Sequence, residues 1–298
     1  MSRIMEDVSK WPIEKRRAKI EEVYKDRIGR ELNLDNPVYF TEKIQWRKLY
    51  EDDPIRKRCT DKLSFKQYVR EKIGDGYSAA LIDVWHSPDN VNINSIPKRC
   101  VVKSNCASEG RYCYVIKDKD NVDLLIVEKE IKDNWFNRLL LNTNSFNRGY
   151  YDVSPCVIVE EYLFDPSEMD EYKFYCFDGE PKYLYRYSDH FKDGQNMYGK
   201  YPVGIYTADW EYTEYRIGKF DREPKREKPW CFDEMKDIAR VLSSEFSFVR
   251  VDFFVTDKKM FVAELAFCPF AGLEPYYPES FDYEMGKLWD LSFTISEV

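Results

Sequence analysis

Two carboxylates and an arginine stand close together near the end of the chain, in a pattern suited to phosphate chemistry. Arg250 and Asp252 lie two residues apart in a strand-like run, 248–255, so both side chains point to one face of the strand. Glu264 lies in a second run, 260–267, across a short turn. If the strand register places Glu264 on the same face, the two carboxylates can bind Mg²⁺ and the neighbouring arginine can stabilise negative charge that develops during the reaction. A solvent-facing charge cluster is the alternative that these three residues alone leave open.

Lysines and acids occur at other strand positions from which a nucleotide can be reached. Lys103 precedes a small-residue loop, Ser104–Gly110, whose N–H groups can cover phosphates. Lys173 is either a phosphate-binding lysine or a surface lysine whose stem lies along the sheet. The segment Glu160–Leu163 ends a strand with two acids. There the backbone can meet an adenine edge, and an acid can bind ribose hydroxyls.

Composition excludes several other kinds of chemistry. The only histidines are His86 and His190, which excludes a histidine-rich zinc site and leaves a Ser-His-Asp hydrolase without its nucleophile elbow. The chain has 54 acidic and 46 basic residues, a net charge of −8, which argues against general nucleic-acid binding. We therefore expect carboxylates and lysines to carry the chemistry.

Other features concern the compartment. The eight cysteines form no CxxC pair, and several lie in apolar runs, so we expect buried free thiols in a reducing cytosol. No apolar stretch approaches the roughly 20 residues that span a bilayer, and Met1–Asp7 lacks a signal-peptide core. These features predict a cytoplasmic protein without a transmembrane segment. An amphipathic helix at 13–28 leaves a partner-facing or peripheral membrane surface open.

Hydrophobic periodicity predicts the elements that position these residues. Helices are expected at 13–28, ending at Gly29, from Thr41, and at 55–72, 122–137 and 232–242. Strands are expected at 99–104, 112–116 and 157–163, with hairpins at 172–187 around Asp178-Gly179 and at 248–267. The segment 190–230 is predicted to be loop-rich. A helical start followed by helices and antiparallel strands predicts the α+β class.

Taken in order, these motifs resemble the ATP-grasp fold, and more closely the TupA-like (teichuronopeptide-biosynthesis-type) ATP-grasp family. The stretches that carry the resemblance are 36–46, 60–62, 68–74, 101–105, 172–182, 248–254 and Glu264-Leu265 followed by Pro269 and Glu274-Pro275. The resemblance implies two α+β lobes that enclose ATP. It divides the chain into a helical N-terminal region (1–75), a small lobe with phosphate loop and hinge (76–165), and a large lobe with the metal-binding hairpin (166–298).

The resemblance also implies a role for each candidate side chain. The residues expected to bind ATP are Lys62, Lys103, Ser104, Ser108 and Gly110 at the phosphates, Glu160, Glu161, Tyr162 and Leu163 at the adenine, and Glu168 at the ribose. Lys173 would add a phosphate-side cation, and Arg250 would face the transferred phosphoryl group or acyl-phosphate. Asp252 and Glu264 would hold Mg²⁺.

The implied activity is that of an ATP- and Mg²⁺-dependent carboxylate–amine ligase acting through an acyl-phosphate. The family's association with capsular and teichuronic polymers suggests a polysaccharide precursor, or a related small metabolite, as substrate. Two alternatives stay open: a kinase that phosphorylates a sugar or another hydroxyl, and a degenerate ATP-grasp protein that binds without catalysis. No oligomeric state follows from the sequence.

Three positions depart from the family pattern. The loop after Lys103 reads Cys-Ala-Ser-Glu-Gly where the family has His-Gly-Ser-Gly-Gly, so Glu109 places a carboxylate where phosphates would pass. Ala266 stands where an Asn or Thr is usual, and it cannot ligate a metal. Phe270 crowds the turn that follows Pro269. These departures are what motivate the binding-protein alternative.

Overall fold

The structure is a computed structural model, and it describes residues 8–106, 112–136, 146–151, 153–165, 168–187, 191–192, 195–196 and 201–291. The N-terminal part is helical, with α1 (Ile13–Ile28), α2 (Phe40–Tyr50), α3 (Pro54–Thr60) and α4 (Lys62–Ile73). Gly29 ends α1 in the left-handed region, with φ of 85°, which confirms the predicted helix end.

The single helix predicted at 55–72 is wrong, because Asp61 separates α3 from α4. Its backbone is extended, and its side chain accepts a hydrogen bond from the Leu63 amide at the start of α4. Asp61 also accepts hydrogen bonds from the Ser64 hydroxyl and the Asn105 amide group. An aspartate at a helix N-cap accepts hydrogen bonds from backbone amides that a continuous helix would bond internally. α4 is therefore a separate helix that begins at Lys62.

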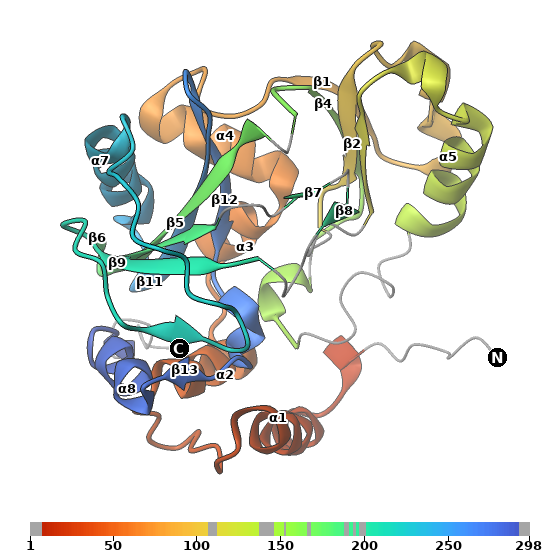
Figure 1. Ribbon diagram of the computed structural model, residues 1–298. Helices are drawn as coiled ribbons and strands as arrows, with labels where there is room; N and C mark the ends of the chain where they lie inside the picture. Colours follow the sequence, from red (N-terminus) through yellow and green to blue (C-terminus); the bar gives the residue numbers. More distant parts are fainter. Residues whose placement is uncertain are drawn as a thin grey trace.

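A small antiparallel sheet follows, with strand order β1-β4-β2-β3. Its strands are β1 (Leu81–Trp85), β2 (Cys100–Ser104), β3 (Cys113–Ile116) and β4 (Val157–Glu161). One face packs against α5 (Leu124–Glu130) and the π-turn that continues it to Trp135 (Figure 1). Val102 and Val159 of the sheet lie with Val127 and Trp135 in one buried cluster.

A larger antiparallel sheet has the order β12-β11-β5-β6-β9. Its strands are β5 (Asp170–Phe177), β6 (Glu180–Tyr187), β9 (Val203–Thr207), β11 (Phe248–Val255) and β12 (Met260–Ala266). Both predicted hairpins are confirmed, and so is the α+β class. The prediction of a loop-rich 190–230 is wrong at β9, which pairs with β6 as an edge strand. Five residues that include a glycine give too short a pattern to predict it.

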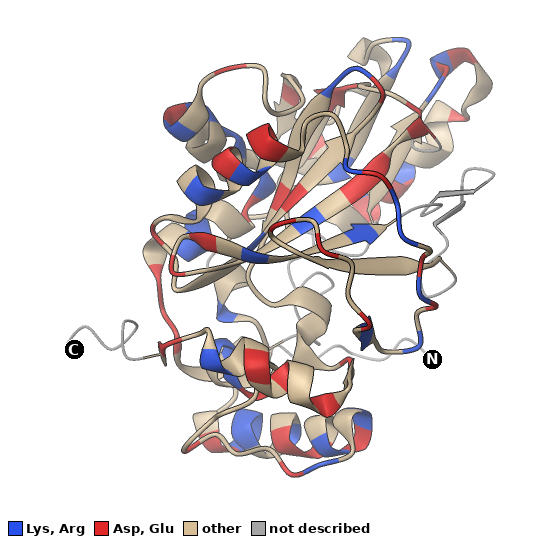
Figure 2. Ribbon diagram, turned by 60° about the vertical axis from the view of Figure 1, so that its left-hand side comes forward, with Lys and Arg blue, Asp and Glu red and all other residues tan. Residues whose placement is uncertain are grey.

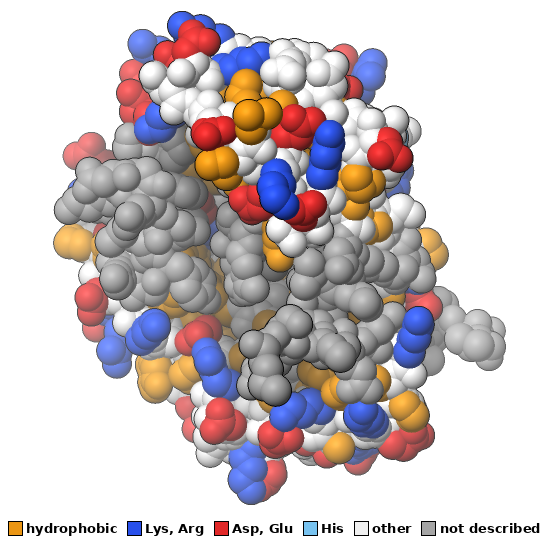
Figure 3. All heavy atoms as spheres, turned by 90° about the vertical axis from the view of Figure 1, so that its right-hand side faces the viewer, with side chains coloured by type: hydrophobic (Ala, Val, Ile, Leu, Met, Phe, Trp, Pro, Cys, Tyr) orange, Lys and Arg blue, Asp and Glu red, His pale blue; other side chains and the backbone are white. Residues whose placement is uncertain are grey.

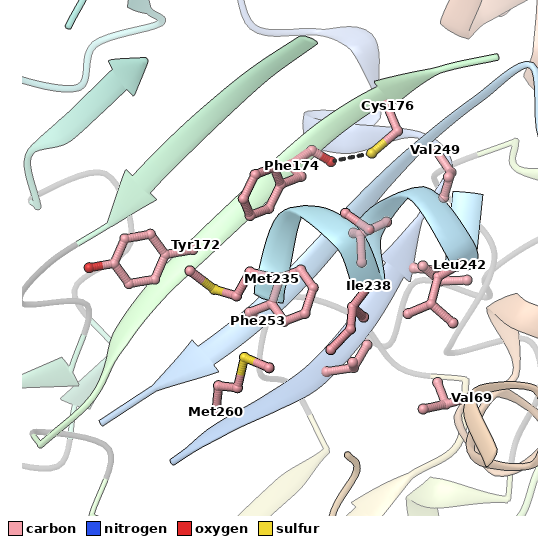
Figure 4. Close-up of a cluster of buried hydrophobic side chains, with 14 of the residues drawn as sticks. Val69, Tyr172, Phe174, Cys176, Met235, Ile238, Leu242, Val249, Phe253 and Met260 are labelled. Carbon is pink, nitrogen blue, oxygen red and sulfur yellow. Dashed lines mark hydrogen bonds between the residues drawn. The ribbon is translucent and has the colours of Figure 1, made fainter. Parts of the chain in front are cut away.

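Helix α7 (Phe232–Ser243) covers the back of the large sheet. Figure 4 shows Met235, Ile238 and Leu242 of this helix against side chains of β5 and β11. Two of those strand side chains, Phe174 and Phe253, meet edge to face at 5.8 Å. All of these residues are buried, so the back face is an apolar core and cannot hold the charged residues of the hairpin.

The front of the large sheet is apolar at one end, where α2 and α8 (Glu279–Lys287) cover it. Phe40 of α2 is fully buried, with its ring 4.8 Å from that of Phe248 and 5.9 Å from that of Trp289. Two further short antiparallel pairs are β10 (Arg216–Ile217) with β13 (Tyr276–Tyr277) and β7 (Phe191–Lys192) with β8 (Gln195–Asn196). Acidic and basic residues occupy other positions along the strands of the large sheet, red and blue on the ribbon (Figure 2).

All eight cysteines lie in the described residues and are free, as predicted. Among the described helices, none has the length and apolar character needed to cross a bilayer. On the face drawn in Figure 3, acidic and basic side chains are interspersed wherever side chains are coloured.

Asp282 fastens α8 to the N-terminal helices. Its carboxylate accepts hydrogen bonds from the Thr41 amide (2.9 Å) and the Thr41 hydroxyl (2.7 Å), and it pairs with Arg30 (2.5 Å). Its side chain is 2% exposed. Since α2 covers the front of the large sheet, this contact helps to hold that cover in place.

We predict that Asp282→Ala lowers the free energy of unfolding by about 3 kcal/mol, because it leaves a partly buried arginine and a helix start without their acceptor. Glu279→Ala is the matched control, since Glu279 pairs with the same Arg30 but is 63% exposed. Its loss should amount to less than about 1 kcal/mol. Urea unfolding followed by circular dichroism measures both, and equal effects would contradict the anchoring role.

Candidate nucleotide and metal site

The charged end of the large sheet is built by strand register. Asp252 of β11 lies opposite Glu264 of β12 on one side and opposite Lys173 of β5 on the other. Residues directly opposite in neighbouring strands project from the same face, so these three side chains form one row. The condition on which the sequence prediction depended is therefore met. A bulge directly follows the row, since Phe253 pairs with Val262 and leaves one β12 residue over.

Asp252 is the centre of a buried ion-pair network. Its carboxylate accepts hydrogen bonds from Arg250 Nε (2.7 Å) and Nη2 (2.6 Å) and from Lys173 Nζ (3.2 Å). Lys173 also pairs with Glu171 at 2.6 Å. Burial disfavours the ammonium, but Asp252 and Glu171 outweigh it and raise the pKa of Lys173 above its usual value. Lys173 is thus a fixed cation and cannot serve as a base at neutral pH.

Glu264 differs from Asp252 in being half-buried and without a hydrogen bond or ion pair from any described residue. Asp252 already uses both lone pairs of Oδ2 and one of Oδ1, which leaves one position on Oδ1. No group of three or more metal-ligating side chains occurs in the described residues, so a metal bound by this part of the chain would have at most two such side chains as ligands. Asp252 and Glu264 fit Mg²⁺, which takes one or two carboxylates and completes its shell with phosphate and water.

A second cluster lies on the small sheet and α4. Glu160 of β4 is 3% exposed and pairs with Lys103 of β2 at 2.6 Å and Lys66 of α4 at 2.7 Å. Burial alone would raise the pKa of the Glu160 carboxyl, but the two lysines hold it below its usual value. Sequence reasoning missed Lys66. Its signal was the spacing of four residues from Lys62, which places both lysines on one face of α4.

Lys62 joins the two clusters. Burial lowers the pKa of its ammonium, Glu264 opposes this effect, and Lys103 adds to it. Helix α4, which begins with Lys62, also packs against β12, the strand of Glu264. The Lys62 backbone amide donates to the Asn105 carbonyl at 3.0 Å, which ties the start of α4 to the end of β2. The elements that carry the predicted cations and carboxylates, α4 and β12, are thus packed together although they are far apart in the sequence.

The other residues predicted to bind ATP have different partners from those of the Asp252 and Glu160 clusters. Glu161 is exposed and accepts a hydrogen bond from the Ala80 amide (2.8 Å), while the Tyr162 ring lies 4.1 Å from the Arg99 guanidinium. Leu163 is half-buried and Glu168 is exposed. Ser104 is fully buried, with its hydroxyl 3.7 Å from Cys106 Sγ, and Ser108, Glu109 and Gly110 lie outside the described residues.

Ala266 is the last residue of β12, and Phe270 lies in the turn that follows this strand. Ala266 pairs with Arg250 and shares the face of Glu264, so a methyl group stands beside the row where the family pattern has a polar side chain. Phe270 adopts a φ of 50°, which begins a left-handed turn.

Comparison with known proteins gives one family match. The TupA-like ATP-grasp family matches residues 42–290, which is most of the chain. This range includes the charged row, the lysines of α4 and the hinge. A comparison with curated proteins found no match.

Similar solved structures have low sequence identity. D-alanine–D-alanine ligase from Bacillus anthracis is 17% identical, with a TM-score of 0.45 over 79% of this chain and 68% of that one. The Helicobacter pylori enzyme of the same name is 13% identical, with a TM-score of 0.43 over 78% and 61%. N5-carboxyaminoimidazole synthase from Aspergillus clavatus, complexed with ADP and 5-aminoimidazole ribonucleotide, is 11% identical, with a TM-score of 0.40 over 73% and 46%. The chain therefore spans between about half and two thirds of their lengths.

We predict that Glu264→Gln weakens divalent-metal binding at least about tenfold, because an amide removes the ligand charge from the site. The melting temperature should stay close to wild type, since the carboxylate has no partner among the described residues. Asp252→Asn should also weaken metal binding. In addition, it should lower the free energy of unfolding by about 3 kcal/mol, because it breaks a buried ion pair. Calorimetric titration with Mn²⁺ and thermal melts separate the two effects. Unchanged affinity in Glu264→Gln would remove this residue from the metal site.

We predict that Lys103→Met weakens binding of Mg-ATP at least about tenfold, a loss of 1.4 kcal/mol or more. Lys66→Met is the matched control, because Lys66 pairs with the same buried Glu160 and its loss should destabilise the fold to a similar extent. Its nucleotide affinity should fall less, because Lys66 Nζ is also held by the Ala79 carbonyl, to which it donates a hydrogen bond. Calorimetry with a non-hydrolysable ATP analogue measures both variants. Equal affinities would assign Lys103 a structural role only.

Proposed function

The chain belongs to the TupA-like ATP-grasp family and has its α+β fold, and from this premise we propose that the enzyme is an ATP- and Mg²⁺-dependent carboxylate–amine ligase. One observation carries the proposal. The row Glu264, Asp252 and Lys173 lies on one face of the large sheet. Helix α4, which begins with Lys62, packs against β12 of that sheet, so that carboxylates for a metal lie on elements in contact with one that supplies a cation for phosphates. An arginine held by two hydrogen bonds lies beside that row.

In this proposal Lys62 and Lys103 contact the phosphates of ATP, and the Glu160–Leu163 segment meets the adenine. Glu160 acts indirectly, since its carboxylate is engaged by Lys103 and Lys66 and so sets where the phosphate lysine points. Ser108 and Gly110 would cover the phosphates, and Glu168 would bind the ribose. Mg²⁺, held by Asp252 and Glu264, would neutralise phosphate charge when bound.

The proposed reaction has two steps. A substrate carboxylate oxygen attacks the γ-phosphorus of ATP, the bond from that phosphorus to the ADP oxygen breaks, and an acyl-phosphate and ADP form. An amine then attacks the acyl carbon, the phosphate leaves with the electron pair of the C–O bond, and the amine loses a proton to give an amide. Lys173 stays protonated and supplies positive charge to the transferred group. Arg250 uses Nε and Nη2 on Asp252, which leaves Nη1 to meet the acyl-phosphate.

The division of the chain and its setting are also proposals. We assign residues 1–75 to a helical N-terminal region, 76–165 to the small lobe and 166–298 to the large lobe. The family resemblance supports a polysaccharide precursor or related small metabolite as substrate, in the cytoplasm. Free cysteines are in keeping with that compartment.

A hydroxylamine trap tests the reaction class. The protein is incubated with ATP, Mg²⁺ and a pool of candidate carboxylates, and hydroxylamine replaces the amine. A ligase should release ADP and form a hydroxamate, because hydroxylamine attacks the acyl-phosphate. Glu264→Gln is the negative control, and mass spectrometry identifies which carboxylate reacted.

Two outcomes would replace the proposal. A stable phosphorylated product that hydroxylamine does not capture would make the protein a kinase. Absence of Mg-ATP binding at millimolar nucleotide would leave a binding protein without catalysis.

A further inference from the structure

The turn that follows the metal strand has an unusual backbone. Phe270, Ala271 and Gly272 have φ values of 50°, 55° and 64°, three consecutive residues in the left-handed region. Side chains with a Cβ atom disfavour that region, so two of the three positions are strained. A Cβ atom on Gly272 would lie 2.5 Å from Gln45 Nε2 and 2.7 Å from Ile44. The turn is therefore pressed against α2.

Two buried side chains of α2 hold this turn by its carbonyl groups. Gln45 Nε2 donates to the Ala271 carbonyl (2.9 Å) and the Gly272 carbonyl (2.8 Å). Lys48 Nζ donates to the Ala271 carbonyl (2.6 Å) and to Gln45 Oε1 (2.9 Å). The two residues are 1% and 2% exposed. They lie three positions apart and so on one face of α2; we call this pair the α2 clamp.

Lys48 is buried, but its ammonium forms no ion pair with a carboxylate of the described residues. Its acceptors are an amide oxygen and a carbonyl, and burial lowers its pKa to about 8, with only Cys268 opposing. By contrast, the neighbouring Arg47 pairs with the buried carboxylate of Glu51. A buried cation without a carboxylate destabilises a fold. Stability alone therefore does not account for Lys48, and its contact with the strained turn needs another reason.

The same helix also fixes the open end of the metal hairpin. Arg47 Nη1 donates to the carbonyl of Phe248, where β11 begins, at 2.8 Å, and to that of Phe267, just after β12, at 3.3 Å. The turn begins at Cys268. Cys268 follows the last residue of β12, Ala266, by two positions and Glu264 by four. The start of the turn is thus closely linked along the chain to the carboxylate expected to hold the metal.

We propose that Lys48 and Gln45 are positioning residues, which hold the turn at 268–272 in its left-handed form and so fix the end wall of the site beside Glu264 and Ala266. This inference rests on the proposed ligase function, because it assigns the turn to the side where the acceptor meets the transferred phosphoryl group. The clamp acts through the backbone and touches no substrate. Loss of the clamp should therefore impair acceptor use and leave nucleotide binding intact.

The test combines a clamp variant with a compensating change in the turn. Lys48→Met should lower kcat at least tenfold and raise the acceptor KM, while the affinity for Mg-ATP stays within twofold of wild type. Ala271→Gly should restore most of that loss, since glycine adopts positive φ without strain. Gln45→Leu provides a second clamp variant if Lys48→Met fails to fold. Both should respond to Ala271→Gly in the same way.

Lys43→Met is the matched control. Lys43 is another lysine of α2 that donates to carbonyls, those of Gly286 (2.8 Å) and Trp289 (2.5 Å), but it contacts α8 and not the turn. Its kcat should match that of wild type. A loss in Lys48→Met that Ala271→Gly does not restore would mean direct action on substrate and would overturn the positioning role. Full activity in Lys48→Met would also overturn it.

A readout that needs no activity keeps this inference separate from the ligase proposal. The Leu273 amide donates to the Phe270 carbonyl across the turn at 3.1 Å, so its hydrogen exchange reports the turn directly. Exchange should speed up at least tenfold in Lys48→Met and stay unchanged in Lys43→Met. If the wild-type protein makes no hydroxamate or ADP, the ligase proposal fails. The hydrogen-exchange rates still test whether the α2 clamp holds the turn. Unchanged exchange in both clamp variants would overturn the clamp itself.

Discussion

The carboxylate of Asp252 is buried in the middle of the large sheet, and much of the site is arranged around that charge. An ionised carboxylate at 3% exposure is tolerated only with close partners. Arg250 supplies two hydrogen bonds from its own strand, and Lys173 supplies one from the neighbouring strand. These bonds fix the directions of both cations before any ligand binds. Preorganised charge of this kind is what phosphoryl transfer requires of a protein.

The buried charge also explains why the front of the sheet is divided. Phe40 and Phe248 close one end with aromatic packing, and the ion pairs occupy the other. Apolar side chains cannot cover the charged end without removing its remaining hydration. Helix α4, which carries Lys62 and Lys66, packs against β12 of the same sheet. Glu264 completes the row with a carboxylate to which no described residue donates. The polar end is thereby left for ligands of opposite charge.

Helix α2 links the apolar and the polar ends. Its aromatic side packs into the sheet, while Arg47, Lys48 and Gln45 donate to carbonyls at the end of the metal hairpin. Buried polar groups of this kind need complete hydrogen bonding, which restricts the hairpin and its turn to one arrangement. The helical N-terminal residues therefore contribute directly to the geometry of a site whose charges lie on other elements.

Local pattern was enough to predict the two hairpins, including the one that carries Asp252 and Glu264, and the end of α1 at Gly29. These depend on alternation, turn residues and capping, which act within a few positions of the chain. The break at Asp61 and the edge strand β9 were not predictable, because hydrogen bonds and pairing with distant residues decide them. The sequence by itself determined which side chains can do the chemistry. Only the tertiary structure decided that Asp252 faces Glu264, because strand register is set by the packing of whole faces.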